Sequence, residues 1–265
     1  MKKLSPYFEV FKLSLENRME YKMNFILSFA VKLIPFAVNI LLWLAAASAG
    51  RFSMTVNQIV TYYCLSLITS NLTVCSIQHE IAGDIRTGSI NRFLIKPMNY
   101  FGYQVMKDLP SRAVFLVFGF LPVTLIFLIL HRYIVFTFSV VNLLLYILSA
   151  VLGYAVNFLL NFLLSELSFY FTNVSSLFAV AGVLQSILSG AVFPLSLLPV
   201  SLEKALSQLP FYFIGFFPNA ILLNQYSLES AALPFLSGLV WFLLLAAACK
   251  RTWGNGLKKY AAFGG

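Results

Sequence analysis

Few side chains in this sequence could do chemistry, and none of them forms a recognisable catalytic group. The two histidines, His79 and His131, lie far apart and lack further ligands at the spacing of a metal site. No serine or cysteine comes with a plausible general base, and Cys64, Cys75 and Cys249 fall in or beside apolar segments as small hydrophobic residues. The phosphate-cradling pattern Gly-x-x-x-x-Gly-Lys-Ser/Thr is absent. We therefore expect no enzyme activity, no metal and no cofactor bound by this chain.

One polar stretch, His79–Met98, holds a concentration of charge between two apolar segments. Its charged residues are Glu80, Asp84, Arg86, Arg92 and Lys96. Its apolar residues recur at helical spacing and are Ile81, Ile85, Ile90, Phe93 and Leu94. Gly88 suits a helix stop, Ser89 a restart and Pro97 an end. The stretch therefore predicts two short helices joined by a tight turn at a membrane surface, where a cytoplasmic partner can bind.

The composition places the whole chain among polytopic membrane proteins. Apolar residues make up 60% of the 265 residues, and charged residues make up 10%, against about 25% in a typical soluble protein. Mean hydropathy is +0.86. The net charge of +9 is explained by positive loops that orient the spans and meet anionic lipid. No basic face is long enough for nucleic acid, so we expect a single all-α transmembrane domain over residues 1–265.

Six segments are apolar enough to cross a bilayer at about 20 residues per crossing. They are Phe25–Ala49, Gln58–Ser76, Ala113–Leu130, Val140–Leu164, Val174–Val192 and Ala231–Cys249. Lys32 lies about two turns inside the first and can extend to the headgroups. The predicted spans contain no acidic residue, which argues against a proton- or sodium-coupled carrier.

Residues 1–24 predict an amphipathic helix on the membrane surface. Apolar and charged residues alternate there at helical spacing, including Phe8, Phe11, Lys12 and Arg18. A solvated helix that packs on another protein is the alternative.

Residues 193–223 predict a broken, re-entrant hairpin before the last span. The run Leu209–Leu223 is too short to span cleanly, and irregular backbone at membrane depth needs protein or water to satisfy it. The residues that shape this segment are Phe193, Pro194, Pro199, Pro210 and Pro218.

The fourth predicted span carries small and amide residues at every fourth position. They are Ser149, Gly153, Asn157, Asn161 and Ser165. Such residues typically join membrane helices to one another. The alternative is that this face lines a substrate path.

The basic residues predict the orientation of the chain. Fourteen Lys and Arg residues fall in the N-terminal segment, in 79–112 and in the C-terminal tail. The opposite loops hold three, Arg51, Arg132 and Lys204. Lys32, inside the first predicted span, is left aside in this count. Because cytoplasmic loops are the basic ones, both termini and the stretch His79–Met98 are expected in the cytoplasm.

Five motifs in this order resemble the permease subunits of the type-two ABC exporter family, in the branch similar to daunorubicin-resistance permeases. They are FKLSLENRMEYKMNF at 11–25, EIAGDIRTGSINRFLIKPMNYFGY at 80–103, LSGAVFPLSLLP at 188–199, LPFYFIGFFP at 209–218 and GLKKYAAFGG at 256–265. The motifs cover nearly the full length. Each is weak alone, and together with six spans they are fairly specific.

The resemblance implies that the loop after the second span is a coupling helix seated in a separate ATP-binding subunit, which would hold ATP and Mg. The residues carried over to that contact are Glu80, Gly83, Asp84, Ile85, Arg86, Gly88 and Arg92. The N-terminal helix would touch the same subunit, and the segment Pro194–Pro218 would form an extracellular gate. A second permease, identical or related, would complete the path.

The resemblance further implies export across a bacterial plasma membrane. A drug, an antimicrobial peptide and a lipid-like amphipath suit the apolar spans, with a glycan as a competing cargo. A motor-independent secondary transporter or channel remains the alternative function, and a membrane-embedded enzyme ranks below it.

Overall fold

The computed structural model describes residues 5–48, 54–94 and 98–260, and all regular structure in those ranges is helical. The predicted all-α class is therefore confirmed. Arg51, Lys96 and Pro97, which the sequence analysis singled out, lie outside the described residues.

Within the described residues, five helical units are long and apolar enough to cross a membrane. The first is α2 (Lys22–Ser48), and the second is α3 (Val56–Thr73), which continues after a break as α4 (Gln78–Arg86). The third consists of α6 (Tyr100–Asp108), α7 (Pro110–Val114), a π-turn η1 (Phe115–Gly119) and α8 (Phe120–Ile129). The last two are α9 (Val140–Glu166) and α13 (Leu228–Lys259). Short 3-10 turns follow α8 and α9, at His131–Tyr133 and Leu167–Phe169.

The predicted fifth span is shorter in the structure than in the sequence pattern. Helix α10 covers Ser175–Leu188, which is 14 residues. At 1.5 Å per residue this is about 21 Å, less than the roughly 30 Å of a bilayer core. Gly190 ends the helical region with φ of +81°, and Ser186 O accepts from the amides of both Ala191 and Val192. The described chain thus has five helices of spanning length, where the sequence predicted six.

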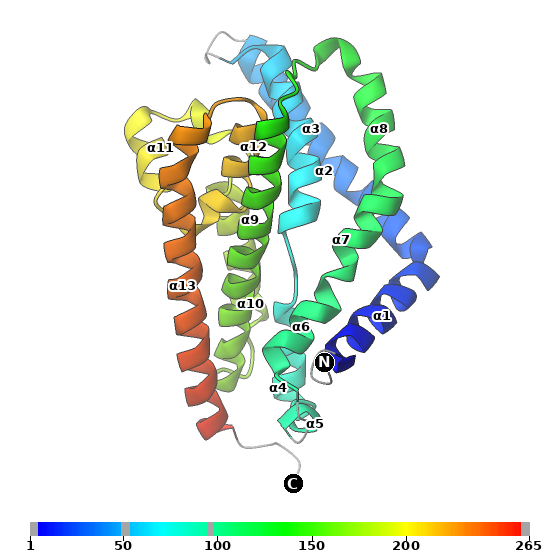
Figure 1. Ribbon diagram of the computed structural model, residues 1–265, viewed down its shortest axis with the longest axis vertical. Helices are drawn as coiled ribbons and strands as arrows, with labels where there is room; N and C mark the ends of the chain where they lie inside the picture. Colours follow the sequence, from blue (N-terminus) through cyan, green and yellow to red (C-terminus); the bar gives the residue numbers. More distant parts are fainter. Residues whose placement is uncertain (1–4, 49–53, 95–97, 261–265) are drawn as a thin grey trace.

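The chain returns to the end at which it starts (Figure 1). Helix α1 (Ser5–Glu20) lies at the lower end together with α4, α5 (Asn91–Leu94) and α6, and α13 ends there. Helix α1 packs against α6 and α7 of its own chain. Tyr7 OH accepts from the amide of Asn99 at 2.9 Å, and Ser14 Oγ donates to Lys107 O at 2.7 Å.

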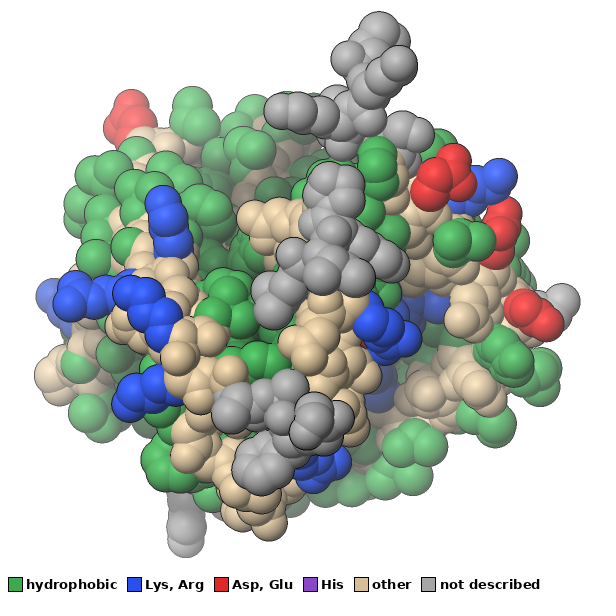
Figure 2. Space-filling view, turned by 90° about the horizontal axis from the view of Figure 1, so that it is seen from below, with side chains coloured by type: hydrophobic (Ala, Val, Ile, Leu, Met, Phe, Trp, Pro, Cys, Tyr) green, Lys and Arg blue, Asp and Glu red, His purple; other side chains and the backbone are tan. Residues whose placement is uncertain are grey.

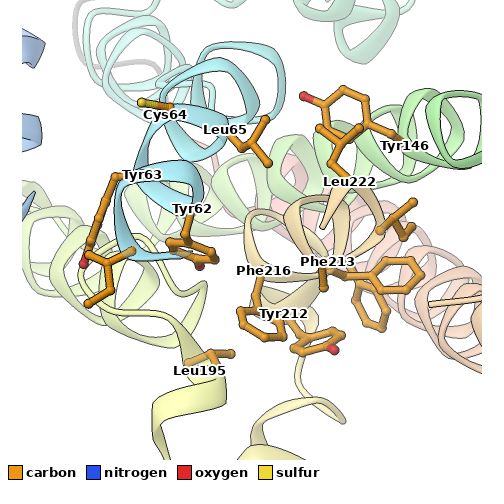
Figure 3. Close-up of a cluster of buried hydrophobic side chains, with 14 of the residues drawn as sticks. Tyr62, Tyr63, Cys64, Leu65, Tyr146, Leu195, Tyr212, Phe213, Phe216 and Leu222 are labelled. Atoms are coloured by element: carbon orange, nitrogen blue, oxygen red, sulfur yellow. The ribbon is translucent and has the colours of Figure 1, made fainter. Parts of the chain in front are cut away.

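The segment 193–223 is broken into short pieces, as its prolines predicted. These pieces are a 3-10 turn at Leu195–Leu197, α11 (Val200–Leu206), a second 3-10 turn at Pro210–Phe213 and α12 (Phe216–Leu222). Pro194, Pro210 and Pro218 are buried, whereas Pro199 is exposed and Phe193 is half-buried. Residues 210–222 form the centre of the largest core cluster (Figure 3), where Tyr62 of α3 lies 6.2 Å from Phe216 between ring centroids.

Side chains of α2 and α3 satisfy irregular backbone in this segment and in the turn at 190–192 that precedes it. Thr73 Oγ1 donates to Ile214 O at 2.6 Å, and Tyr62 OH donates to Gly190 O at 2.8 Å. Val192 O accepts from both Trp43 Nε1 and Tyr63 OH. Protein groups therefore replace water around these carbonyls, which is the condition for broken backbone at membrane depth.

The small-residue stripe of α9 packs inside the chain. Ser149, Asn157, Asn161 and Ser165 are all buried. A Cβ atom on Gly153 would lie 2.3 Å from Phe213 O, so only glycine allows the 210–213 turn to approach α9 this closely. These contacts within one chain are those that the helix-packing interpretation expects.

Candidate functional site

The polar stretch that the sequence singled out is built by α4, a turn and α5. Helix α4 ends at Arg86, Gly88 adopts φ of +77°, and α5 begins at Asn91. The amide of Ile90 donates to Asp84 O at 3.2 Å and closes the turn. The predicted pair of short helices with a glycine turn is confirmed.

The inner face of this unit anchors it to α9. Ile81, Ile85 and Ile90 are buried in a cluster that also contains Val156, Leu159 and Phe162. Ile85 was expected to contact a partner, but its side chain is 3% exposed. It therefore supports the surface from inside instead of lining it.

The outer face presents basic side chains and an open glycine. Arg86 and Arg92 are exposed, and neither forms an ion pair with any described residue. A Cβ atom on Gly83 would meet nothing within 4 Å. Figure 2 shows this end of the molecule, with basic side chains over one side and the centre and the few acidic ones at the rim.

The two acidic residues of the predicted contact are engaged within the chain. Tyr100 OH donates to Asp84 Oδ2 at 2.7 Å, and Lys107 Nζ lies 2.5 Å from Glu80 Oε1. The Lys107–Glu80 pair is partly exposed and contributes little to stability. Its effect is to neutralise Glu80, so the surface that remains unpaired is positive and suits an acidic partner surface.

The joint between α3 and α4, residues 74–77, is held from two sides. Arg112 donates to Val74 O at 2.7 Å and to Leu72 O at 3.3 Å, while the amide of Cys75 donates to Asn157 Oδ1 at 2.8 Å. The carbonyls that α3 leaves open at its end thus receive a fixed guanidinium.

Arg112 is in turn held by a buried partner. Its Nη1 lies 2.5 Å from Asp108 Oδ2, and both side chains are 11% exposed. Tyr154 OH donates to the same carboxylate at 3.0 Å, and the Tyr154 ring lies 4.3 Å from the guanidinium carbon. The sequence analysis missed this group, although the i, i+4 spacing of Asp108 and Arg112 around Pro110 is a signal that could have found it.

The end of α13 completes the support of the α4–α5 surface. The ring of Trp253 stacks on Tyr100 with centroids 5.2 Å apart, and Tyr260 contacts Phe169 edge to face. Burial raises the pKa of the Tyr260 hydroxyl above its ordinary value. A Cβ atom on Gly88 would lie 3.7 Å from that hydroxyl oxygen.

The remaining predicted site residues lie elsewhere. On α1, Phe8, Lys12 and Arg18 are exposed and Phe11 is half-buried, with Phe8 and Phe11 stacked at 6.5 Å. The predicted gate, residues 193–223, carries α11 and α12 at the opposite end of the molecule from α5. No group of three or more metal-ligating side chains occurs within the described ranges.

Comparison with known proteins places the chain in a transporter family. No curated protein matches the sequence. The family model described as ABC-2 family transporter protein matches residues 33–264, which include every spanning helix except the start of α2. With five helices of spanning length, this multi-pass membrane chain belongs to the ABC-2 transporter family and is a permease subunit of an ABC transporter.

Proposed function

We propose that this chain is the permease of an ATP-driven exporter and that the α4–α5 surface is the coupling element that docks on a separate ATP-binding subunit. One observation carries the proposal: the exposed, unpaired Arg86 and Arg92 and the open Gly83 lie together on a unit anchored to the core. ATP and Mg belong to the partner, since the sequence contains no pattern that cradles nucleotide phosphates.

The joint 74–77 transmits the motion in this proposal. Closure of the ATP-binding subunits on ATP displaces α4, and the groups fixed on the joint, Arg112 and Asn157, carry that displacement to α7 and α9. The spans then tilt and change the side to which the path opens. The differential affinity of ATP for the closed state supplies the work.

The proposed topology has six crossings with both termini in the cytoplasm of a bacterium. Helix α10 brings the chain from the lower end after α9 toward the end that carries α11 (Figure 1). With its following turn it acts as the fifth of the six crossings, and residues 193–223 re-enter from the extracellular side as a gate. The basic residues at the lower end support this orientation.

A second permease, identical or related, completes the path, and the cargo is a drug, a peptide or a lipid-like amphipath. The apolar residues that α10 exposes, Val180, Val183 and Leu184, support contact with lipid or with such a partner. The motifs at 80–103 and 188–199 support placement in the daunorubicin-resistance-like branch.

Co-purification tests this function. We expect a stoichiometric ATP-binding subunit to accompany the tagged chain from its native membrane in mild detergent. Gly83→Trp and Arg86→Glu should abolish that association and the stimulated ATP hydrolysis without loss of membrane insertion. Arg132→Glu is the matched control, because Arg132 is an exposed arginine on the turn after α8. Transport by the chain purified alone would overturn the proposal in favour of a motor-independent carrier.

A further inference from the structure

A polar cavity of about 630 Å³ lies between α1, α2, α3, α6 and α7. Its wall contains residues of α1 and of the first part of α2. The cavity extends to the joint 74–77. It is therefore located where the surface helix passes into the first span, at the level of lipid headgroups in a membrane-embedded chain. The proposed coupling role uses groups in one wall of this space, the joint 74–77 and Arg112, and leaves the space itself without a function.

The cavity is positively charged. Four of its lining residues are basic, namely Arg18, Lys32, Lys107 and Arg112, and two are acidic, namely Glu80 and Asp108. Lys107 pairs with Glu80 and Arg112 pairs with Asp108. Arg18 and Lys32 form no ion pair with any described residue, and the one hydrogen bond that Lys32 Nζ donates goes to the neutral Asn71 Oδ1 at 2.6 Å. Two positive charges thus remain for an anion.

Neutral hydrogen-bonding groups surround these two charges. They are supplied by Asn17, Asn24, Ser28, Ser70 and Ser111. Amides and hydroxyls beside basic residues are the groups that bind phosphate oxygens and the hydroxyls of a glycerol headgroup. The lining therefore suits a phosphate ester better than a bare metal cation, which the two basic residues would repel.

An apolar groove of about 340 Å³ adjoins the polar cavity. Its walls are Ile68, Phe115, Leu116, Phe120, Val123, Thr124 and Phe127. Phe115 lines both spaces, so the polar cavity and the groove share this residue as a common wall. Phe115 also begins the π-turn, a distortion that frequently marks functional sites in helices. A Cβ atom on Gly119 would lie 2.4 Å from this ring, so glycine is what lets Phe115 lie across the helix.

We propose that this pair of spaces binds an anionic phospholipid, with its phosphate headgroup between Arg18 and Lys32 and one acyl chain in the groove past Phe115. The charge selects an anionic headgroup, and the neighbouring apolar groove selects a lipid over a soluble phosphate. The bound lipid would link α1 to α2 and α7, beside the joint that leads to α4. The proposal needs the membrane setting and does not depend on the ATP-binding subunit.

Lipid titration of the purified full-length chain, read by native mass spectrometry, tests the site. Each Lys or Arg near an anionic lipid contributes about fivefold to affinity. We expect Arg18→Gln/Lys32→Gln to weaken phosphatidylglycerol binding about 25-fold and to leave phosphatidylcholine binding unchanged. Lys12→Gln/Lys258→Gln removes two charges from α1 and α13 outside the cavity and should change neither lipid more than about twofold.

A second variant separates a lipid from a soluble anion. Thr124→Phe should fill the groove and weaken diacyl phosphatidylglycerol, because the acyl chain loses its space. Unchanged lipid affinity in Arg18→Gln/Lys32→Gln would overturn the proposal. So would displacement of the lipid by inorganic phosphate together with no effect of Thr124→Phe, since that pattern belongs to a soluble phosphate site. Size-exclusion profiles confirm that each variant is folded.

Discussion

Single glycines differ in what a side chain at their position would meet, and this difference can be tested. Gly153→Ala should lower stability by about 1–3 kcal/mol, because the new methyl group would overlap Phe213 O, a backbone atom that cannot rotate away. Gly182→Ala is the matched control on α10, where a Cβ atom meets nothing within 4 Å. We expect it to be neutral or to stabilise the helix by about 0.5–1 kcal/mol. Thermal unfolding in detergent measures both, and equal midpoints would contradict the packing described for α9.

For single residues, the sequence predicted which side chains are charged better than it predicted which groups they contact. The family resemblance implied that Arg86 and Asp84 both contact another subunit. In the structure Arg86 remains unpaired, whereas Asp84 accepts from Tyr100, which lies 16 positions along the chain. Helical periodicity describes one helix and cannot predict a contact between two separate helices. It therefore could not predict that Asp84 contacts Tyr100 of its own chain.

At the scale of elements, the joint 74–77 depends on a buried charge pair. Arg112→Leu should destabilise the chain by about 3–5 kcal/mol, because it leaves Asp108 buried without its cation. Arg112→Leu/Asp108→Leu should recover much of that loss, since no unpaired charge remains. Neither variant restores the hydrogen bonds to Leu72 O and Val74 O.

Hydrogen exchange at residues 74–77 distinguishes loss of the Asp108–Arg112 charge pair from loss of the hydrogen bonds that fix the joint. We expect faster exchange at these residues in both variants. Global stability should be lost mainly in the single variant, Arg112→Leu. Protected amides in Arg112→Leu would contradict the assignment of Arg112 as the group that fixes the joint.

Most helices could be predicted because apolar residues mark them, and the deviations have physical causes. Helix α13 continues to Lys259, ten residues beyond the predicted end at Cys249, because its last turns leave the apolar region but still pack Trp253 on Tyr100. Helix α10 is shorter than its apolar run, because Gly190 takes a left-handed conformation that ends it. Hydropathy measures what fits in lipid, not where a helix begins or ends.

At the scale of the whole molecule, orientation can be read by labelling. The three cysteines are free and buried, so the unmodified chain gives little background. We expect Arg132→Cys and Lys204→Cys to react with a membrane-impermeant maleimide added outside intact cells. Arg86→Cys and Lys258→Cys should react only after the cells are permeabilised, because the proposed topology places the basic end in the cytoplasm. The reverse pattern would invert the proposed topology.

The coupling role of α4–α5 is tested most directly by a photo-crosslink. A benzophenone side chain at position 86 is placed on the exposed end of α4, and the same group at position 204 is the control on the exposed part of α11. We predict that illumination of native membranes joins position 86 to an ATP-binding subunit, that ATP changes the yield, and that position 204 gives no such product. A crosslink from position 204, or none from position 86 in a complex that hydrolyses ATP, would contradict the account.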